Sequence, residues 1–231
     1  MSAEHESHER RAATARLAGA LYLSFILASV LADQIGRIGL SNEDALADLI
    51  ATAETRFRVG LVFALVSQLL FLLAAWVLHV LLRPFGRSLA LLFLLLNAVG
   101  VAVYAASLVV LTVGLAPEAP AGAALVAIDL HGNGVVAAQL FFSTWLVPLG
   151  ILLLRSRLVP RALGYLVLLD AVAVAFWFLQ ALLVPDRPEL SYPAFAVSLL
   201  AEAGLSLWLL IRGVPEPAPA RPGGRAAEQH A

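Results

Sequence analysis

Residues 88–114 read SLALLFLLLNAVGVAVYAASLVVLTVG, a run that follows Arg87 directly and contains no charged side chain. A helix needs about 20 mostly apolar residues to cross the ~30 Å hydrocarbon core of a bilayer. This run is longer than that, so it predicts a helix that spans a membrane.

Five further stretches have the same character. The six predicted spans are residues 17–36, 59–82, 88–114, 133–154, 161–184 and 193–212. The whole chain agrees, because 61% of its residues are hydrophobic and 13% are charged, with a mean hydropathy of +0.90, whereas soluble domains are about 25% charged. We therefore predict an all-α membrane protein. A six-helix transmembrane bundle over residues 15–213 lies between disordered tails at 1–14 and 214–231.

The distribution of arginine predicts the orientation, since loops on the cytoplasmic side carry an excess of basic residues. All cationic residues of the chain are arginines. One side of the predicted bundle holds Arg10, Arg11, Arg16, Arg83, Arg87, Arg155, Arg157, Arg161, Arg212, Arg221 and Arg225. The other side holds Arg37, Arg56, Arg58 and Arg187. This asymmetry predicts that both termini are cytoplasmic.

The first external loop is expected to contain a short helix. Within residues 37–58, the segment 41–55 begins with acidic residues in its first turn, which favours a helix N-terminus. Apolar residues recur in it at helical spacing and form one face. These residues are Leu46, Leu49, Ile50 and Ala53.

The first span has two interpretations. Arginines before an apolar run that ends in Val30-Leu31-Ala32 fit a signal peptide with its cleavage site. Small residues at every fourth position, however, form one helical face suited to close packing against another helix, and a segment destined for removal has no need of such a face. These are Ala20, Ser24, Ala28, Ala32 and Gly36.

Three polar residues interrupt the apolar spans. Asn97, Asp170 and Glu202 each lie nine or ten residues from the arginine that marks the end of their span. At 1.5 Å per residue this places all three about 14–15 Å deep. Because a polar or ionisable group at that depth is costly, it is by default a functional candidate.

Neighbouring residues extend this set. Ser198, Glu202 and Ser206 recur every four residues and give the last span a polar face, and Gln68 adds a polar group to the second span. Antiparallel packing of the last two spans would bring Asp170 and Glu202 face to face. Such a pair suits a proton relay, a cation site or an intramembrane general acid. The alternative is that both are protonated carboxyl groups that serve packing alone.

His131 belongs to the segment Asp129-Leu-His-Gly-Asn-Gly, directly before the predicted fourth span. Its glycines permit an irregular backbone or a close approach of another segment. The segment is therefore either an external loop that contacts a ligand or the N-terminal cap of the fourth span, with His131 at the membrane interface.

The composition excludes several chemistries. The chain has no cysteine, which rules out disulfides, thiolate metal sites and cysteine nucleophiles. A net charge of −1 and the lack of a basic patch argue against a nucleic-acid partner. His79 and His131 are predicted on opposite sides of the membrane, so they cannot share a cofactor. We expect neither a metal nor a cofactor.

Six stretches of the chain resemble the bacterial membrane-protein family known as domain of unknown function 4386. They are residues 15–23 (ARLAGALYL), 56–60 (RFRVG), 80–84 (VLLRP), 129–134 (DLHGNG), 157–164 (RLVPRALG) and 202–213 (EAGLSLWLLIRG). The resemblance implies six helices and a bacterial membrane. It supplies no catalytic residues.

Three hypotheses for the function remain open. The favoured one is a small carrier or ion-coupled protein of the bacterial inner membrane, with a small molecule or a proton as ligand of the midplane polar residues. The second is an intramembrane enzyme that acts on a lipid-like substrate with Asp170 or Glu202 as general acid. The third is a non-catalytic scaffold or partner subunit. The sequence leaves the oligomeric state open.

Overall fold

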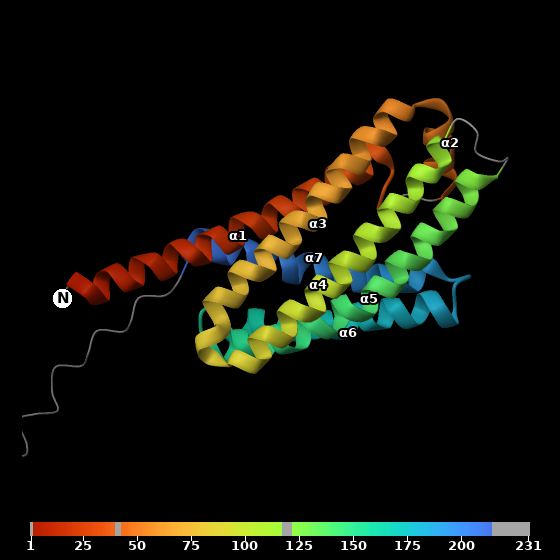
Figure 1. Ribbon diagram of the computed structural model, residues 1–231. Helices are drawn as coiled ribbons and strands as arrows, with labels where there is room; N and C mark the ends of the chain where they lie inside the picture. Colours follow the sequence, from red (N-terminus) through yellow and green to blue (C-terminus); the bar gives the residue numbers. More distant parts are fainter. Residues whose placement is uncertain (1, 40–42, 117–121, 214–231) are drawn as a thin grey trace, which may run out of the picture.

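The computed structural model describes residues 2–39, 43–116 and 122–213, and all regular structure within these ranges is helical (Figure 1). The α-helices are α1 (Ser2–Gly36), α2 (Glu43–Thr52), α3 (Glu54–Leu82), α4 (Arg87–Val110), α5 (Ala123–Ser156), α6 (Arg161–Leu183) and α7 (Tyr192–Arg212). Three short 3-10 helices are η1 (Arg83–Phe85), η2 (Leu111–Leu115) and η3 (Pro188–Ser191). All α-helices except α2 are long and apolar enough to cross a membrane, as a multi-pass membrane protein requires.

Two helices begin earlier than the sequence predicts. The prediction of a disordered tail at residues 1–14 is wrong for the described residues, because α1 begins at Ser2. The segment is rich in Ala, Glu and Arg, which are good helix formers, and it continues an already stable helix. The predicted tail at 214–231 lies outside the described residues. The helix α5 begins at Ala123, ten residues before the predicted fourth span.

The spanning helices alternate in direction and give the bundle two distinct ends. We call the end with Arg83, Arg87, Arg155, Arg161 and Arg212 the arginine-rich end. The opposite end, where α2 lies, is called the α2 end (Figure 1). The helix α2 buries Leu46, Leu49 and Ile50 in an apolar cluster with residues of α1, α3, α4, η2 and α5 at that end.

The six spanning helices form a closed ring. Each packs against two neighbours in the order α1, α3, α4, α5, α6, α7 and back to α1. The most extensive interface joins α1 to α3, and the two helices run side by side in Figure 1. A signal peptide ending at Ala32 would remove most of this interface, so the packing favours a retained first span. The ring places α4 opposite α7.

Glycines allow α1 to approach its neighbours closely. A Cβ atom on Gly60 of α3 would overlap the Cα of Gly36, and one on Gly19 would come within 2.5 Å of the backbone of Ser206 and Leu210 in α7. The small-residue face predicted for the first span is partly correct. Its second half packs inside the protein, with Ala28 and Ala32 buried together with Gly36, whereas Ser24 is exposed. Small residues are expected at such contacts, since lipid offers helices no hydrophobic driving force to associate.

A single added methyl group at this crossing tests the ring. Gly60→Ala is expected to lower the free energy of unfolding by about 1–3 kcal/mol, because the methyl group meets rigid backbone. The matched control is Gly204→Ala, whose new methyl group would meet only the flexible end of Leu163, at 3.2 Å. This change is expected to be neutral or stabilising, since Ala favours a helix over Gly by about 1 kcal/mol. Thermal unfolding of both purified variants in detergent measures the difference, and equal stability would contradict the close crossing.

Candidate functional site

The interface between α6 and α7 is built around Asp170. Its side chain is fully buried. Its Oδ1 accepts a hydrogen bond of 2.5 Å from the hydroxyl of Ser198 on α7. Its other oxygen, Oδ2, is buried with no hydrogen-bond partner in the described part of the chain. The predicted meeting of the last two spans at Asp170 is therefore present, but the direct partner is Ser198, one turn before Glu202.

Glu202 lies on the wall of a cavity inside the ring. The cavity has a volume of about 190 Å³, and all six spanning helices contribute to its lining. Glu202 is half-buried, and within the described ranges neither Glu202 nor Asp170 forms an ion pair with a basic residue. The hydroxyl of Tyr22 on α1 is buried near both carboxyl groups without completing a hydrogen bond. The described part of the chain thus places an acidic group in the interior of the bundle without a counter-charge.

Apart from the aromatic residues, four further polar side chains line this cavity: Ser29 on α1, Gln68 on α3, Gln139 on α5 and Ser198 on α7. Gln68 is 6% exposed, and its Nε2 makes a long bond of 3.4 Å to the hydroxyl of Ser67. Its carbonyl oxygen Oε1 has no partner among the described residues. A buried acceptor left without a partner usually costs about 1–3 kcal/mol, so an acceptor that lines a cavity is a natural contact for a ligand.

A second cavity of about 400 Å³ continues from this site toward the α2 end. It is lined by Asp33, Gln34 and Gly39 near the C-terminal end of α1. The two cavities share five lining residues, which form the boundary between them: Phe25, Ser29, Tyr104, Trp177 and Phe195. The wall that carries Glu202 is therefore adjacent to a space that reaches one end of the bundle.

The sequence model of a protein family matches residues 17–213, which include nearly the whole ring. The chain belongs to that family, described as Domain of unknown function (DUF4386). The resemblance noted in the sequence is thereby confirmed. No curated protein and no solved structure matches the chain. For this DUF4386 protein, the chemistry of the site must be argued from its geometry.

Asn97 and Ser206 do not join the site of the DUF4386 protein. Asn97 is fully buried on α4, across the ring from α7, and neither atom of its amide has a partner in the described part of the chain. Ser206 is fully buried, and its hydroxyl donates to the carbonyl of Ala203 in its own helix. Asn97 therefore does not lie beside the two carboxyl groups, although its predicted depth in the membrane equals theirs.

Both interpretations of the segment around His131 are wrong, because residues 129–134 lie within α5 and form neither a loop nor a cap. His131 is buried, with its Nδ1 3.0 Å from the hydroxyl of Ser107 on α4. The close approach expected of the glycines is present, since a Cβ atom on Gly134 would overlap Ser107. His131 lines neither of the two cavities. It joins α4 to α5 outside the candidate site.

The structure adds residues that the sequence does not single out. Tyr22 and Gln139 contribute polar groups, and half of the residues that line the cavity are aromatic. Gln139 carries a detectable signal, as a polar residue in a predicted span. The aromatic residues of the cavity wall cannot be identified from the sequence, because an aromatic side chain in an apolar span can face lipid equally well.

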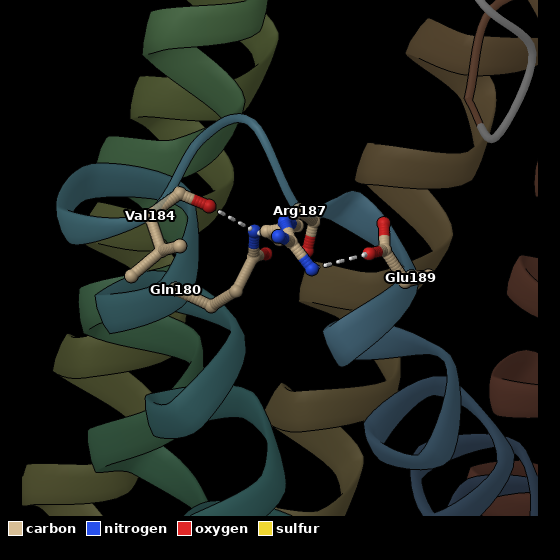
Figure 2. Close-up of polar contacts among 4 residues, drawn as sticks. All are labelled: Gln180, Val184, Arg187 and Glu189. Carbon is tan, nitrogen blue, oxygen red and sulfur yellow. Dashed lines mark hydrogen bonds and ion pairs between the residues drawn. The ribbon is translucent and has the colours of Figure 1, made fainter.

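Gln180 is a further addition, at the end of α6 away from the site (Figure 2). Its buried side-chain amide donates hydrogen bonds of 2.9 Å and 3.0 Å to the carbonyls of Val184 and Arg187. Figure 2 also shows the ion pair of Arg187 with Glu189, at 3.9 Å between exposed side chains. Exposed pairs contribute little, so the amide of Gln180 is the main polar support of the connection that leads into α7.

Two serines of α7 provide a matched test of this interface. Ser198→Ala leaves the buried carboxyl of Asp170 without a hydrogen bond from the described residues, so a loss of about 1–3 kcal/mol in the free energy of unfolding is expected. Ser206→Ala removes only a bond to a carbonyl of the same helix, and a change within about 0.5 kcal/mol is expected. Thermal unfolding measures both. If the two substitutions cost the same, the bond between Ser198 and Asp170 does not support the interface.

Proposed function

We propose that this DUF4386 protein is a small carrier or ion-coupled protein that binds its ligand in the cavity beside Glu202. The observation that carries the proposal is an acidic side chain, with no counter-charge among the described residues, on the wall of a cavity lined by all six spanning helices. Ionisable residues inside membrane bundles typically face such a cavity and mark an ion or substrate pathway.

The shape of the bundle supports transport over a purely structural role. A scaffold subunit needs packed helices and lateral surfaces, and it gains nothing from an internal cavity that carries an acidic group. Here Gln68, Gln139, Ser198 and Glu202 come from three different helices and face one space. The adjoining second cavity offers a route between this space and the α2 end. The intramembrane enzyme remains the alternative in which Glu202 would act as a general acid.

The orientation completes the proposal. The excess of arginine at the arginine-rich end supports a cytoplasmic location for that end and for both termini in a bacterium. The α2 end then faces the periplasm, and the cavity pair leads from the periplasmic side to the middle of the inner membrane. A carrier must also expose the same site to the cytoplasm in a second conformation.

Labelling of single cysteines tests the proposed site, and it needs no background removal because the natural chain contains no cysteine. Ser29→Cys and Gln68→Cys are expected to react with membrane-impermeant methanethiosulfonates, one cationic and one anionic, added from the α2 side. Leu69→Cys is the control, because Leu69 is 56% exposed on the outer surface of the bundle, where lipid excludes the reagents. Reaction of Gln68→Cys from the arginine-rich side as well is expected of a carrier. If Gln68→Cys is as unreactive as Leu69→Cys from both sides, the carrier proposal fails.

Reporter fusions test the orientation separately. A periplasm-active phosphatase fused after Arg212 or within residues 157–160 is expected to be inactive, whereas one fused within residues 184–187 is expected to be active, because that connection lies at the α2 end. A fluorescent protein that matures only in the cytoplasm should give the opposite pattern at each position. The reverse pattern would invert the proposed orientation and leave the cavity itself unaffected.

A further inference from the structure

We propose that the ligand of the Glu202 cavity is an organic cation with an apolar body, either a protonated amine or a quaternary ammonium. This inference rests on the proposed binding site and adds the chemical class of its ligand. The observation behind it is a carboxyl group that forms no ion pair with the described residues, on the wall of a cavity whose lining residues are half aromatic.

The charge of the cavity selects a cation. Glu202 lines it directly, and Asp170 lies behind Ser198 with one oxygen unpartnered among the described residues. Among the described residues, no arginine or histidine lines it. The free carbonyl oxygen of Gln68 adds an acceptor, not a donor. The described lining offers no positive charge to an anionic ligand, whereas a cation supplies the charge that a buried carboxylate lacks.

The aromatic walls select the kind of cation. Trp177 and Phe195 meet edge to face with ring centroids 4.6 Å apart, and Phe25 stacks on Phe71 at 4.3 Å. Trp145 meets the edge of Phe71 at 5.2 Å. Ring faces attract organic cations, and ammonium groups are held in aromatic cages. A calcium or magnesium ion instead takes six or more oxygen ligands, whereas half of the residues that line this cavity are aromatic.

The same rings lie on the route to the site. Phe25, Tyr104, Trp177 and Phe195 line both cavities, so a ligand that enters from the α2 end passes between aromatic faces before it reaches Glu202. The entrance cavity carries a further carboxyl group, Asp33. Acidic and aromatic residues therefore line both cavities, through which a cation would move from the α2 end to Glu202.

Binding of the cation is expected to release a proton. A carboxylate without a counter-charge in a bundle interior is unstable, so an empty Glu202 holds a proton that an arriving cation replaces. The exchange balances as one monocation bound and one proton released. The other titratable groups that face Glu202 are Tyr22 from α1, Tyr104 from α4 and Asp170 from α6, while α3 and α5 present the amides Gln68 and Gln139. Affinity for the cation should therefore rise with pH until Glu202 is deprotonated in the empty protein.

Calorimetric titration of the full chain in lipid nanodiscs with benzyltrimethylammonium tests this inference. We expect saturable binding that is stronger at higher pH. Titrations in buffers of different ionisation enthalpy should show release of up to one proton per bound cation. Neopentylbenzene, in which carbon replaces the charged nitrogen, should give no heat beyond that of empty nanodiscs. Equal binding of the uncharged analogue, or no binding of the cation, would overturn the inference.

Variants assign the binding to this cavity. Glu202→Gln should weaken the cation roughly 100-fold or more and abolish proton release, whereas Glu202→Asp, which keeps the charge, should retain both. Trp177→Leu should weaken binding roughly 3- to 10-fold. Trp76→Leu is its control, because Trp76 is 55% exposed on the outer surface and should have no effect. Unchanged binding in Glu202→Gln, or equal losses in the two tryptophan variants, would overturn the assignment.

The labelling experiment separates this inference from the proposed function. If Gln68→Cys reacts from both sides but benzyltrimethylammonium does not bind, the cavity is a carrier site for another ligand, and only the cation inference fails. If the cation binds, it should protect Gln68→Cys from the reagents, and the cationic reagent should react faster than the anionic one. Faster reaction of the anionic reagent would contradict a cation site.

Discussion

The closed ring of six helices around one acidic side chain is the constraint on which the structure depends. A carboxyl group in a hydrocarbon layer is tolerated only where protein or water replaces lipid around it. The ring achieves this by placing Glu202 on an inner wall to which every spanning helix contributes. Closure in turn requires that α1 lie close to both α3 and α7, which the glycines at positions 19, 36 and 60 permit. The glycines and Glu202 therefore depend on one another, because the close packing that the glycines allow keeps lipid away from the carboxyl group.

Sequence reasoning predicts the elements of this fold well, because membrane crossing imposes a strong one-dimensional signal. A helix must satisfy its own backbone within lipid, so runs of apolar residues between arginines mark the spans. Errors arise where a helix continues beyond the membrane. The first turns of α1 and the start of α5 contain charged residues or glycines that resemble a tail or a loop. In these segments the helix is supported by its continuation and by packing, which hydropathy does not report.

The site is predicted less completely, because position in a sequence gives depth but not direction. Distance from an arginine places Asn97, Asp170 and Glu202 in one layer, and Asp170 and Glu202 do lie on adjoining helices. Asn97 is on the opposite side of the ring, where no neighbour in the described structure satisfies its amide. The polar face of α7 shows the same limit. Ser198 and Ser206 have equal spacing from Glu202, yet only Ser198 meets a group on another helix.

The arrangement around Glu202 also explains why two carboxyl groups can have different roles. Asp170 is fully buried, held by Ser198 and away from the cavity lining, so it is not free to exchange partners. Glu202 is half-buried on the cavity wall, with the hydroxyl of Tyr22 close by, and it forms no ion pair with the described side chains. Because a ligand-exchanging group must be reachable, Glu202 fits that role, whereas Asp170 fits a role in joining α6 to α7. The hydrogen bond from Ser198 links the two, since it joins the buried carboxyl to the helix that carries the accessible one. A ligand that shifts the α7 side of the cavity wall would therefore also shift α6, through the hydrogen bond between Ser198 and Asp170. Occupancy of the cavity would in this way be coupled to the packing of these two helices.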